Sequence, residues 1–271
     1  MNFSSPYTRD YRTTPRTPGW LARTFPAVLF YSRAWDIVWQ ASKLARHGRY
    51  DDQAWLGSAL RTMHAIEDLG GMVTVENVAA YADLNGPSVI IANHMSTFET
   101  FALPAIVLPY RRVTFVVKRQ LVEMPVFKHV MRSRQPIVVG RANPRDDLRT
   151  VLEEGEARLR AGSSVVVFPQ KTRAASFTPA ECNSIGVKLA RRAGVPVSPL
   201  ALRTDAWGLG RLVKDMGPVC PHKPVRFAFG PALTVSGNGR EAHEAAVAFI
   251  AATLRAWSVP VLDRAPEAEP D

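Results

Sequence analysis

The sequence predicts an α/β fold in which a mostly parallel central sheet carries helices on both faces and follows an N-terminal helical segment. Three observations predict it. The chain of 271 residues is 46% hydrophobic and 21% charged, which is typical of a globular protein with a sizeable core. After Gly71, short apolar runs alternate with longer segments of helical period. Before Gly71, apolar residues recur mainly at three- and four-residue steps.

Two helices are predicted before the sheet, after an arm without a visible period. Residues 1–19 are rich in Thr, Pro and Arg, which predicts a disordered arm. Residues 20–70 are expected to be helical. An amphipathic helix with many aromatic residues and basic flanks is expected at 21–46, and Asp51 can cap a second helix that ends near Asp68.

The main domain is predicted to span residues 71–260, followed by an acidic tail at 261–271. Its β-type runs are nearly continuous in apolar residues, as expected for strands that are buried on both faces of a parallel sheet. These runs are 72–75, 88–92, 114–117, 137–139, 164–168, 196–202 and 225–229, and the helical candidates between them are 96–107, 125–132, 145–161, 182–193 and 240–257.

Charge is unevenly distributed along the chain. The formal net charge is +10, with +6 in residues 1–50 and +8 in residues 111–173. Such an excess suits an anionic partner, whether nucleic acid, a membrane surface or a phosphorylated substrate. The sequence contains no helix-turn-helix, zinc or aromatic-and-basic strand motif, so nucleic-acid binding is not expected.

Cysteine content and hydropathy restrict the expected compartment. Cys182 and Cys220 are too few for a disulfide scaffold and lie in no zinc-binding pattern, which favours a reducing, cytosolic environment without a metal. The arm lacks the apolar region of a secretory signal. The longest apolar runs are about ten residues, against roughly 20 for a spanning helix, so neither export nor a spanning helix is expected.

A histidine follows an apolar strand at the point where open α/β sheets bind their ligands. His94 lies just past the run at 88–92, and Glu99 follows it in a His-x4-acid spacing. An imidazole can take a proton from a hydroxyl at neutral pH, and a carboxylate can fix its tautomer and stabilise the imidazolium. His94 and Glu99 are therefore a candidate general base and its orienting acid.

Simpler interpretations compete with catalysis. Ser96-Thr-Phe-Glu99 is a capping box that would open the next helix without a catalytic role. His47 is also followed five residues later by an acid, Asp52, so spacing alone is weak support for a catalytic pair.

Basic residues cluster at predicted strand ends. Several strand ends converge on one edge of a parallel sheet, so cations there could surround one anion. Arginine offers a bidentate fork to phosphate and lysine a mobile point charge, a combination that suits a phosphorylated head group. Taken singly, each cation is more often solvated. The residues concerned are Lys118, Arg141, Lys171 and Arg173.

Four sequence blocks and a final strand follow one another between residues 86 and 235. They are Asn93-His94-x4-Glu99; Lys118-Arg-Gln-Leu121-x3-Pro125-Val-Phe127 with Ile137-Val-Val-Gly-Arg141; Val165-Val-Val-Phe168-Pro169-Gln170-Lys171-Thr172-Arg173; Gly194-Val-Pro196-Val-Ser-Pro199-Leu; and Val225-Arg-Phe-Ala-Phe-Gly230-Pro231. In this order they resemble the motifs of the glycerolipid acyltransferase family, which includes the lysophosphatidate acyltransferases. That family usually has Asp at the end of the first motif, and the related lipid A acyltransferases have Glu.

The sequence departs from the family pattern mainly in the third block. The family has Phe-Pro-Glu-Gly-Thr-Arg, whereas Gln170 and Lys171 replace the Glu and Gly here. In the second block, Lys128 and Gln135 stand where glycines are common, and Gly140 stands where an Asp often precedes the Arg. The resemblance is therefore to a divergent member with an altered acceptor pocket.

The resemblance implies an O-acyltransferase of phospholipid biosynthesis. It would move a fatty acyl group from a thioester, on coenzyme A or acyl carrier protein, to a hydroxyl of a lysophospholipid or related phosphorylated lipid, without a metal or bound cofactor. His94 would be the base and Glu99 its orienting acid, with backbone N–H groups at the start of the Ser96 helix as candidate oxyanion donors. Candidate acceptor-binding residues are Lys118, Arg141, Lys171, Thr172 and Arg173, of which Lys171 rests on charge alone.

Two further alternatives concern activity and location. A catalytically idle lipid- or carrier-binding protein would keep the fold and the basic edge, and the altered third block favours it. The helical segment at 20–46 has the composition of an interfacial helix, which predicts a peripheral protein on the cytoplasmic face of an anionic membrane. Its tryptophans could instead pack against the α/β core.

Overall fold

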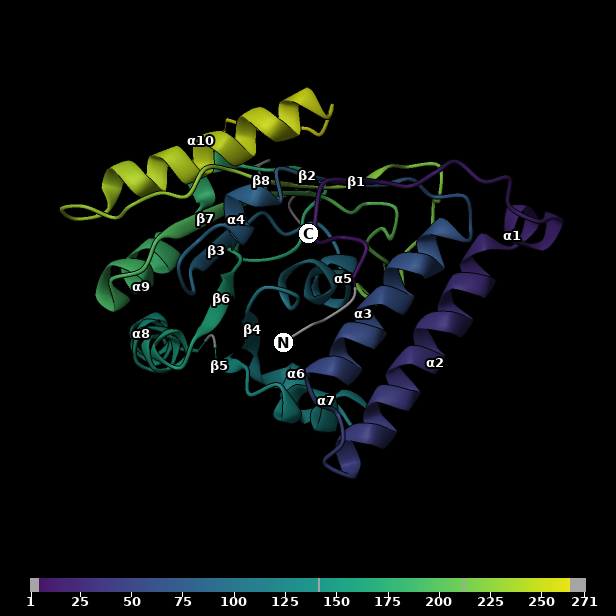
Figure 1. The fold of residues 1–271 in the computed structure, drawn as a ribbon, viewed down its shortest axis with the longest axis horizontal. Helices are drawn as coiled ribbons and strands as arrows, with labels where there is room; N and C mark the ends of the chain where they lie inside the picture. Colours follow the sequence, from purple (N-terminus) through teal and green to yellow (C-terminus); the bar gives the residue numbers. More distant parts are fainter. Residues whose placement is uncertain (1–4, 141, 212, 264–271) are drawn as a thin grey trace, which may run out of the picture.

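A computed structural model describes residues 5–140, 142–211 and 213–263. Within these residues, eight strands form one sheet in the order β1-β2-β8-β7-β3-β6-β4-β5 (Figure 1). Pairing is parallel except between β1 and β2 and between β7 and β8. The predicted α/β class is therefore confirmed. The strands are β1 Tyr11–Arg12, β2 Val73–Glu76, β3 Val89–Ala92, β4 Arg112–Lys118, β5 Ile137–Val139, β6 Ser163–Val167, β7 Val197–Arg203 and β8 Val225–Phe229.

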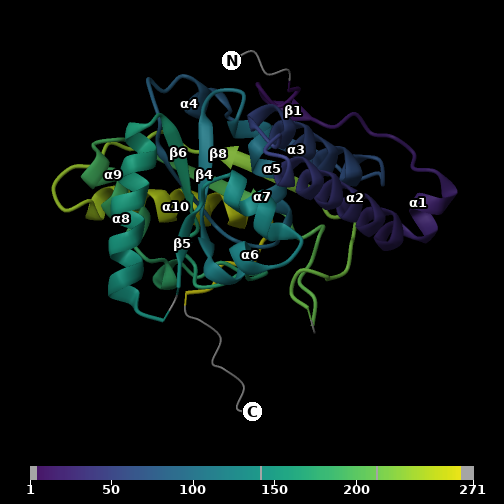
Figure 2. The same cartoon turned by 90° about the horizontal axis from the view of Figure 1, so that it is seen from below.

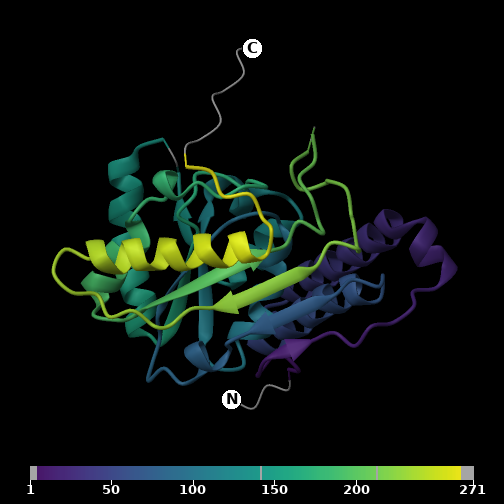
Figure 3. The same cartoon turned by 90° about the horizontal axis from the view of Figure 1, so that it is seen from above.

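Helices cover both faces of the sheet. In Figure 1, α5, α3 and α2 lie on one face, and α8, α9 and α10 lie on the other. Figure 3 shows α10 lying over the sheet, close to β7. The helices are α1 Trp20–Thr24, α2 Pro26–Arg46, α3 Asp52–Glu67, α4 Ala79–Ala82, α5 Phe98–Val107, α6 Arg119–Glu123, α7 Phe127–Ser133, α8 Pro144–Arg160, α9 Ile185–Ala193 and α10 Arg240–Ala256, with a 3-10 turn at Pro179–Glu181.

Strand β3 explains why the apolar runs are continuous. All four of its residues are buried. Ile90 and Ala92 belong to the core under α3 and α5, whereas Val89 and Ile91 belong to the core under α8, α9 and α10. Successive side chains of a strand point to opposite faces, so a strand between two helical layers must be apolar at every position.

The N-terminal helices form where they are expected, with one break. Pro26 lacks the N–H of a helix interior and begins α2, so the single helix expected at 21–46 is divided into α1 and α2. Asp51 caps α3, and its carboxylate accepts a hydrogen bond of 2.9 Å from the Ala54 N–H. Both α2 and α3 contribute buried residues to the same core as the sheet.

The expectation of a disordered arm is wrong from residue 5 onward. Tyr7 is fully buried, and β1 extends the sheet beside β2. The hydroxyls of Tyr7, Tyr11 and Thr13 donate hydrogen bonds of 3.3, 2.7 and 2.6 Å to the carboxylate of Glu67 on α3. These long-range contacts have no periodic signature in the sequence. Residues 1–4 of the arm and 264–271 of the predicted tail lie outside the described residues.

The antiparallel pairing of β7 with β8 is not anticipated by the sequence. Helical crossovers connect parallel strands, but the described part of the connection at 204–224 contains no helix. The chain therefore returns beside β7 in the opposite direction. This connection, green in Figure 2, also reaches the loops that follow β3 and β6, where Asp215 contacts Thr97 and Arg173.

Candidate active site

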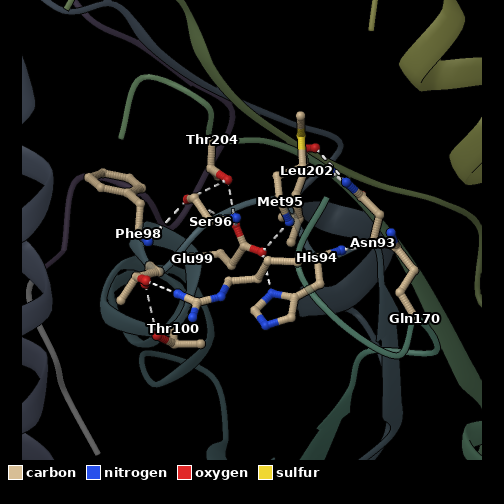
Figure 4. Close-up of polar contacts among 12 residues, drawn as sticks. Asn93, His94, Met95, Ser96, Phe98, Glu99, Thr100, Gln170, Leu202 and Thr204 are labelled. Carbon is tan, nitrogen blue, oxygen red and sulfur yellow. Dashed lines mark hydrogen bonds and ion pairs between the residues drawn. The ribbon is translucent and has the colours of Figure 1, made fainter. Parts of the chain in front are cut away.

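His94 lies two residues beyond β3, in the loop that leads to α5 (Figure 4). Its Nδ1 lies 2.6 Å from Glu99 Oε1, and its ring stacks on Phe168 with centroids 4.1 Å apart and an interplanar angle of 12°. The side chain is 19% exposed. A proton on Nδ1 that is shared with Glu99 leaves Nε2 as the basic nitrogen of the neutral imidazole.

Glu99 is fully buried, but its carboxylate is extensively hydrogen-bonded. Oε1 accepts from His94 Nδ1 and from the Met95 N–H at 2.8 Å. Oε2 accepts from the Ser96 N–H at 3.1 Å, the Ser96 hydroxyl at 3.3 Å and the Thr204 hydroxyl. A buried carboxylate needs such donors because burial removes its hydration. Glu99 is therefore held in one orientation by two segments of the chain, residues 94–96 and Thr204.

The capping box and the His–Glu pair coexist in one side chain. The Ser96 N–H donates to Glu99, and the Ser96 hydroxyl accepts from the Phe98 N–H at 3.1 Å, so residues 96–99 do open α5. The other carboxylate oxygen of Glu99 contacts His94. The two interpretations of this motif are not exclusive.

Two polar residues fix the loop of His94 to strand β7. The Asn93 side-chain amide donates to the Leu202 carbonyl at 2.8 Å and accepts from the Leu202 N–H at 2.7 Å. Thr204, one residue past β7, donates to Glu99 and pairs with the Ser96 hydroxyl at 2.9 Å. Sequence analysis missed Thr204, although its position at a strand end is the signal that identified His94.

The loop after β6 holds His94 from the other side. Gln170 is buried, and its Oε1 accepts a hydrogen bond of 2.7 Å from the His94 N–H. The Ala174 N–H donates to the His94 carbonyl at 3.0 Å. Gln170 stands where the family has Glu, and its amide oxygen supplies the hydrogen-bond acceptor that a carboxylate would also supply. The substitution therefore keeps this acceptor without a negative charge.

Arg173 is brought close to the His94 loop but is already paired. Its Nη1 contacts the hydroxyl of Thr97 and Oδ1 of Asp215, and the Thr97 hydroxyl donates to the same Asp215 oxygen at 2.6 Å. Although burial raises the pKa of Asp215, the hydrogen bonds and charge of Arg173, the Thr97 hydroxyl and the charge of Lys118 lower it below its ordinary 3.8. Asp215 is therefore ionised at neutral pH. No local pattern identifies it in the sequence.

The other candidate binding residues differ in their position relative to Arg173. Lys118 ends β4, and its charge acts on Asp215, which places it near Arg173. Lys171 and Thr172 are exposed in the loop after β6. Arg141 lies outside the described residues. The structure thus brings His94, Glu99 and Arg173 together. His94 contacts Glu99, and Arg173 contacts Thr97 in the same segment. The charge of Lys118 acts on Asp215, the partner of Arg173.

The competing His47 pair does not form. His47 is exposed at the end of α2, where its Nδ1 lies 2.8 Å from the Lys43 carbonyl. Asp52 instead pairs with Arg134 at 2.8 Å and with Arg112 at 3.3 Å. Among the residues that the structure describes, no three His, Cys, Asp or Glu side chains gather in a way that could hold a metal ion.

Three tryptophans of α1 and α2 are exposed. Trp20, Trp35 and Trp39 are 70%, 60% and 55% exposed, whereas Trp55 of α3 is buried in the core. Leu21 of α1, Val28 of α2 and Phe25 between the two helices are also exposed. We call these six exposed residues, which lie on α1, on α2 and between them, the aromatic face. In the described part of the chain, no helix is both long enough and apolar enough to span a bilayer.

Comparisons with known proteins agree with the motifs and the fold. A family model described as Acyltransferase matches residues 72–203. A 1-acyl-sn-glycerol-3-phosphate acyltransferase of Pseudomonas aeruginosa is 30% identical over 189 residues, which are 68% of this chain and 70% of that protein. Lysophosphatidylcholine acyltransferase 2 of Danio rerio is 30% identical over 138 residues, which are 50% of this chain and 24% of that protein.

A solved structure shares the fold at low sequence identity. The 1-acyl-sn-glycerophosphate (LPA) acyltransferase PlsC of Thermotoga maritima superposes with a TM-score of 0.64 and 17% identity, covering 86% of this chain and 94% of that chain. The sequence relationship to the Pseudomonas protein and the family match together establish the descent that the motifs indicate. The chain belongs to the glycerolipid acyltransferase family.

Proposed function

We propose that this protein is an O-acyltransferase that moves a fatty acyl group from a thioester donor to a hydroxyl of a lysophospholipid or related phosphorylated lipid. The observation that carries the proposal is the contact between His94 and the fully buried Glu99 at the edge where β3 ends. The relatives named above, whose names specify acylglycerol phosphate and lysophosphatidylcholine as acceptors, support this substrate class.

In the proposed reaction, His94 Nε2 removes the proton from the acceptor hydroxyl as that oxygen attacks the thioester carbonyl. The tetrahedral intermediate then expels the thiolate, the C–S bond breaks, and the imidazolium returns the proton to sulfur. The products are an ester and a free thiol. Positioned proton transfer of this kind contributes about 10²–10⁴-fold to rate.

Glu99 has two roles in this scheme. It holds the proton of His94 on Nδ1, which leaves Nε2 free of a proton before the reaction. It then stabilises the positive charge that develops on the ring. Because its other hydrogen bonds are satisfied by Met95, Ser96 and Thr204, the carboxylate does not need to reorganise when that charge appears.

The backbone groups expected to stabilise the oxyanion have other partners. The N–H groups of Met95 and Ser96 donate to Glu99, and the Phe98 N–H donates to the Ser96 hydroxyl. We therefore do not assign the oxyanion role to these groups. Arg173, with Lys118 beside it, is the strongest candidate to bind the acceptor phosphate, while Lys171 and Thr172 are exposed candidates at the rim.

A matched assay of donors and acceptors tests this function. The purified protein is incubated with acyl-CoA or acyl carrier protein thioesters and a panel of lysophospholipids, and products are identified by mass spectrometry. An ester product that requires His94 supports the proposal. Binding of lysolipid or donor without turnover in every combination would favour the idle binding protein instead, whose main support is the altered third block.

We also propose that the aromatic face binds an anionic membrane surface and brings the site to its lipid acceptor. Trp35 and Trp39 lie four residues apart on the exposed side of α2, where amphipathic aromatic rings suit the headgroup boundary. Each nearby cation contributes about 1 kcal/mol at such a surface before screening. Arg33 is already paired with Asp68, which reduces its contribution.

Liposome flotation tests this surface. Binding of the full chain to vesicles with phosphatidylserine should weaken with salt and should fall strongly in a Trp35→Ser, Trp39→Ser double variant. Met124→Ser removes an exposed apolar residue outside α1 and α2 and serves as the control. Equal flotation of the double variant and the parent would reject the aromatic face as the membrane contact.

A further inference from the structure

The expected phosphate ligand, Arg173, is occupied by an internal anion. Asp215 comes from the connection between β7 and β8, 42 residues further along the chain. One oxygen of its carboxylate contacts both the guanidinium of Arg173 and the hydroxyl of Thr97. A guanidinium presents a fork that fits the oxygens of a carboxylate or a phosphate equally well. Asp215 thus occupies a position that an acceptor phosphate would take.

This ion pair lies next to the proposed base. Thr97 follows His94 by three residues, and the Ala174 N–H beside Arg173 donates to the His94 carbonyl at 3.0 Å. An anion on Arg173 would therefore lie near the reacting hydroxyl of the same lipid. The Asp52–Arg134 pair has similar chemistry but contacts Tyr50 rather than the His94 loop.

The backbone around Asp215 is anchored independently of its carboxylate. The Trp207 indole N–H donates to the Asp215 carbonyl at 3.2 Å, and the Tyr31 hydroxyl donates to the Gly217 carbonyl at 2.6 Å. The Asp215 side chain is 46% exposed. Rotation of this side chain toward solvent would free Arg173 while the anchored backbone stays in place.

The charges around Arg173 allow a phosphate to replace the Asp215 carboxylate as its partner. Arg173, Lys118 and Asp215 together carry one net positive charge. With the Asp215 carboxylate turned away from it, Arg173 presents its charge to an incoming anion, and the charge of Lys118 acts on the same place. A phosphomonoester carries about −1.5 to −2 at pH 7, so it is a stronger anion for Arg173 than one carboxylate. The carboxylate therefore spares Arg173 an unpaired, largely buried charge until a stronger anion replaces it.

We propose that Asp215 is an acceptor-specificity residue whose carboxylate competes with the acceptor phosphate for Arg173. The inference rests on the proposed function, because it takes Arg173 as the phosphate ligand. Competition weakens the binding of every acceptor that uses this phosphate contact and leaves unphosphorylated acceptors unaffected. Asp215 thereby limits the preference for phosphorylated over neutral lipids and also favours release of a phosphorylated product.

The test compares three variants of the full chain. Asp215→Asn keeps the shape and one acceptor oxygen but removes the competing charge. Arg173→Ala removes the phosphate ligand. Asp205→Asn is the matched control, because it neutralises an acid of the same connection whose partners are Arg203 and Lys223. Binding of inorganic phosphate is measured by calorimetry, and KM and kcat are measured with lysophosphatidate and with monoacylglycerol.

Asp215→Asn should tighten phosphate binding and lower the KM for lysophosphatidate by about two- to fivefold, the range that a partly exposed ion pair provides. The kcat, and the KM for monoacylglycerol, should match those of the parent and of Asp205→Asn. Weaker phosphate binding or a higher KM in Asp215→Asn would overturn the inference, because Asp215 would then position Arg173 rather than compete for it. An equal change with monoacylglycerol would also overturn it.

Failure of the underlying function is distinguishable. Arg173→Ala should abolish phosphate binding and raise the KM for lysophosphatidate. If Arg173→Ala leaves both at the parent values, Arg173 is not the phosphate ligand, and the proposed acceptor assignment fails together with the competition. The calorimetric measurement does not depend on turnover, so it separates this result from loss of catalysis.

Discussion

Replacing Glu99 by glutamine should damage the site more than the similar shapes of the two side chains suggest. The Met95 N–H donates to Oε1 and the Ser96 N–H donates to Oε2. Glutamine has one acceptor oxygen and one NH2 group, so in either orientation one of these backbone donors faces another donor. With the NH2 group at the Oε2 position it faces the Ser96 N–H, and at the Oε1 position it faces the Met95 N–H and also His94 Nδ1.

The magnitudes follow from this arrangement. One buried donor left without an acceptor costs about 1–3 kcal/mol of unfolding free energy. For a chain of this size, that lowers the Tm by about 2–4 °C per kcal/mol. The loss of negative charge beside the imidazolium should lower kcat by about 10²–10⁴ with little change in KM. Glu99→Ala should be worse on both counts, because it leaves both backbone donors without the carboxylate.

The assay measures thiol release from the donor together with thermal unfolding. Glu67→Gln is the matched control, since Glu67 is also a buried carboxylate that accepts three hydroxyl hydrogen bonds, but these come from Tyr7, Tyr11 and Thr13 rather than from the His94 loop. It should lower the Tm and keep kcat. If Glu99→Gln keeps kcat within about threefold of the parent, Glu99 does not stabilise the imidazolium and acts only as a helix cap.

Four further predictions concern His94, Gln170 and Cys182. His94→Ala should abolish turnover with a small change in Tm, whereas His47→Ala should leave kcat unchanged; equal losses in the acyl-transfer assay would disprove the assignment of the base. Gln170→Ala should lower kcat by removing the acceptor of the His94 N–H, and Gln170→Glu should retain more activity because it keeps that acceptor. Burial, with a smaller effect of Glu181, raises the pKa of Cys182 to about 12, so its thiol should react slowly with thiol reagents at pH 8 in the folded protein and faster after unfolding. Since that folded-state pKa lies above the ordinary 9.0, this residue's contribution to stability should be complete below pH 9.0 and decline as the pH rises further, which pH-dependent unfolding of Cys182→Ala against the parent would detect.

Local patterns predicted the elements of the fold because burial imposes a local signature. Strand β5 has the predicted bounds at both ends, and β3 begins one residue later than predicted, because a strand between two helical layers is apolar throughout. The arm at 5–13 could not be predicted, since its order depends on hydroxyl contacts to Glu67, which lies more than 50 residues away. The periodicity of apolar residues along a sequence carries no information about such distant contacts.

The same division applies to the candidate site. His94 and Glu99 were identified because they share one short segment at a strand end. Thr204 and Asp215 follow β7 in the chain. They lie near His94 only because β7 is next to β3 in the order of strands in the sheet. Charge predicted a basic edge but did not reveal that Arg173 is already paired with an acid.

The two outer strands of the sheet are very short, and this affects how the protein behaves at high concentration. Strand β1 has two residues and β5 has three, so each edge offers few unpaired backbone groups to a neighbouring molecule. β1 is held by the hydroxyls on Glu67, and it pairs with Thr74 and Val75 of β2. A chain shortened from its N-terminus past residue 13 would expose the outer backbone of β2 and the core beneath it. Such a chain should self-associate through that edge, whereas the full chain is protected from aggregation there.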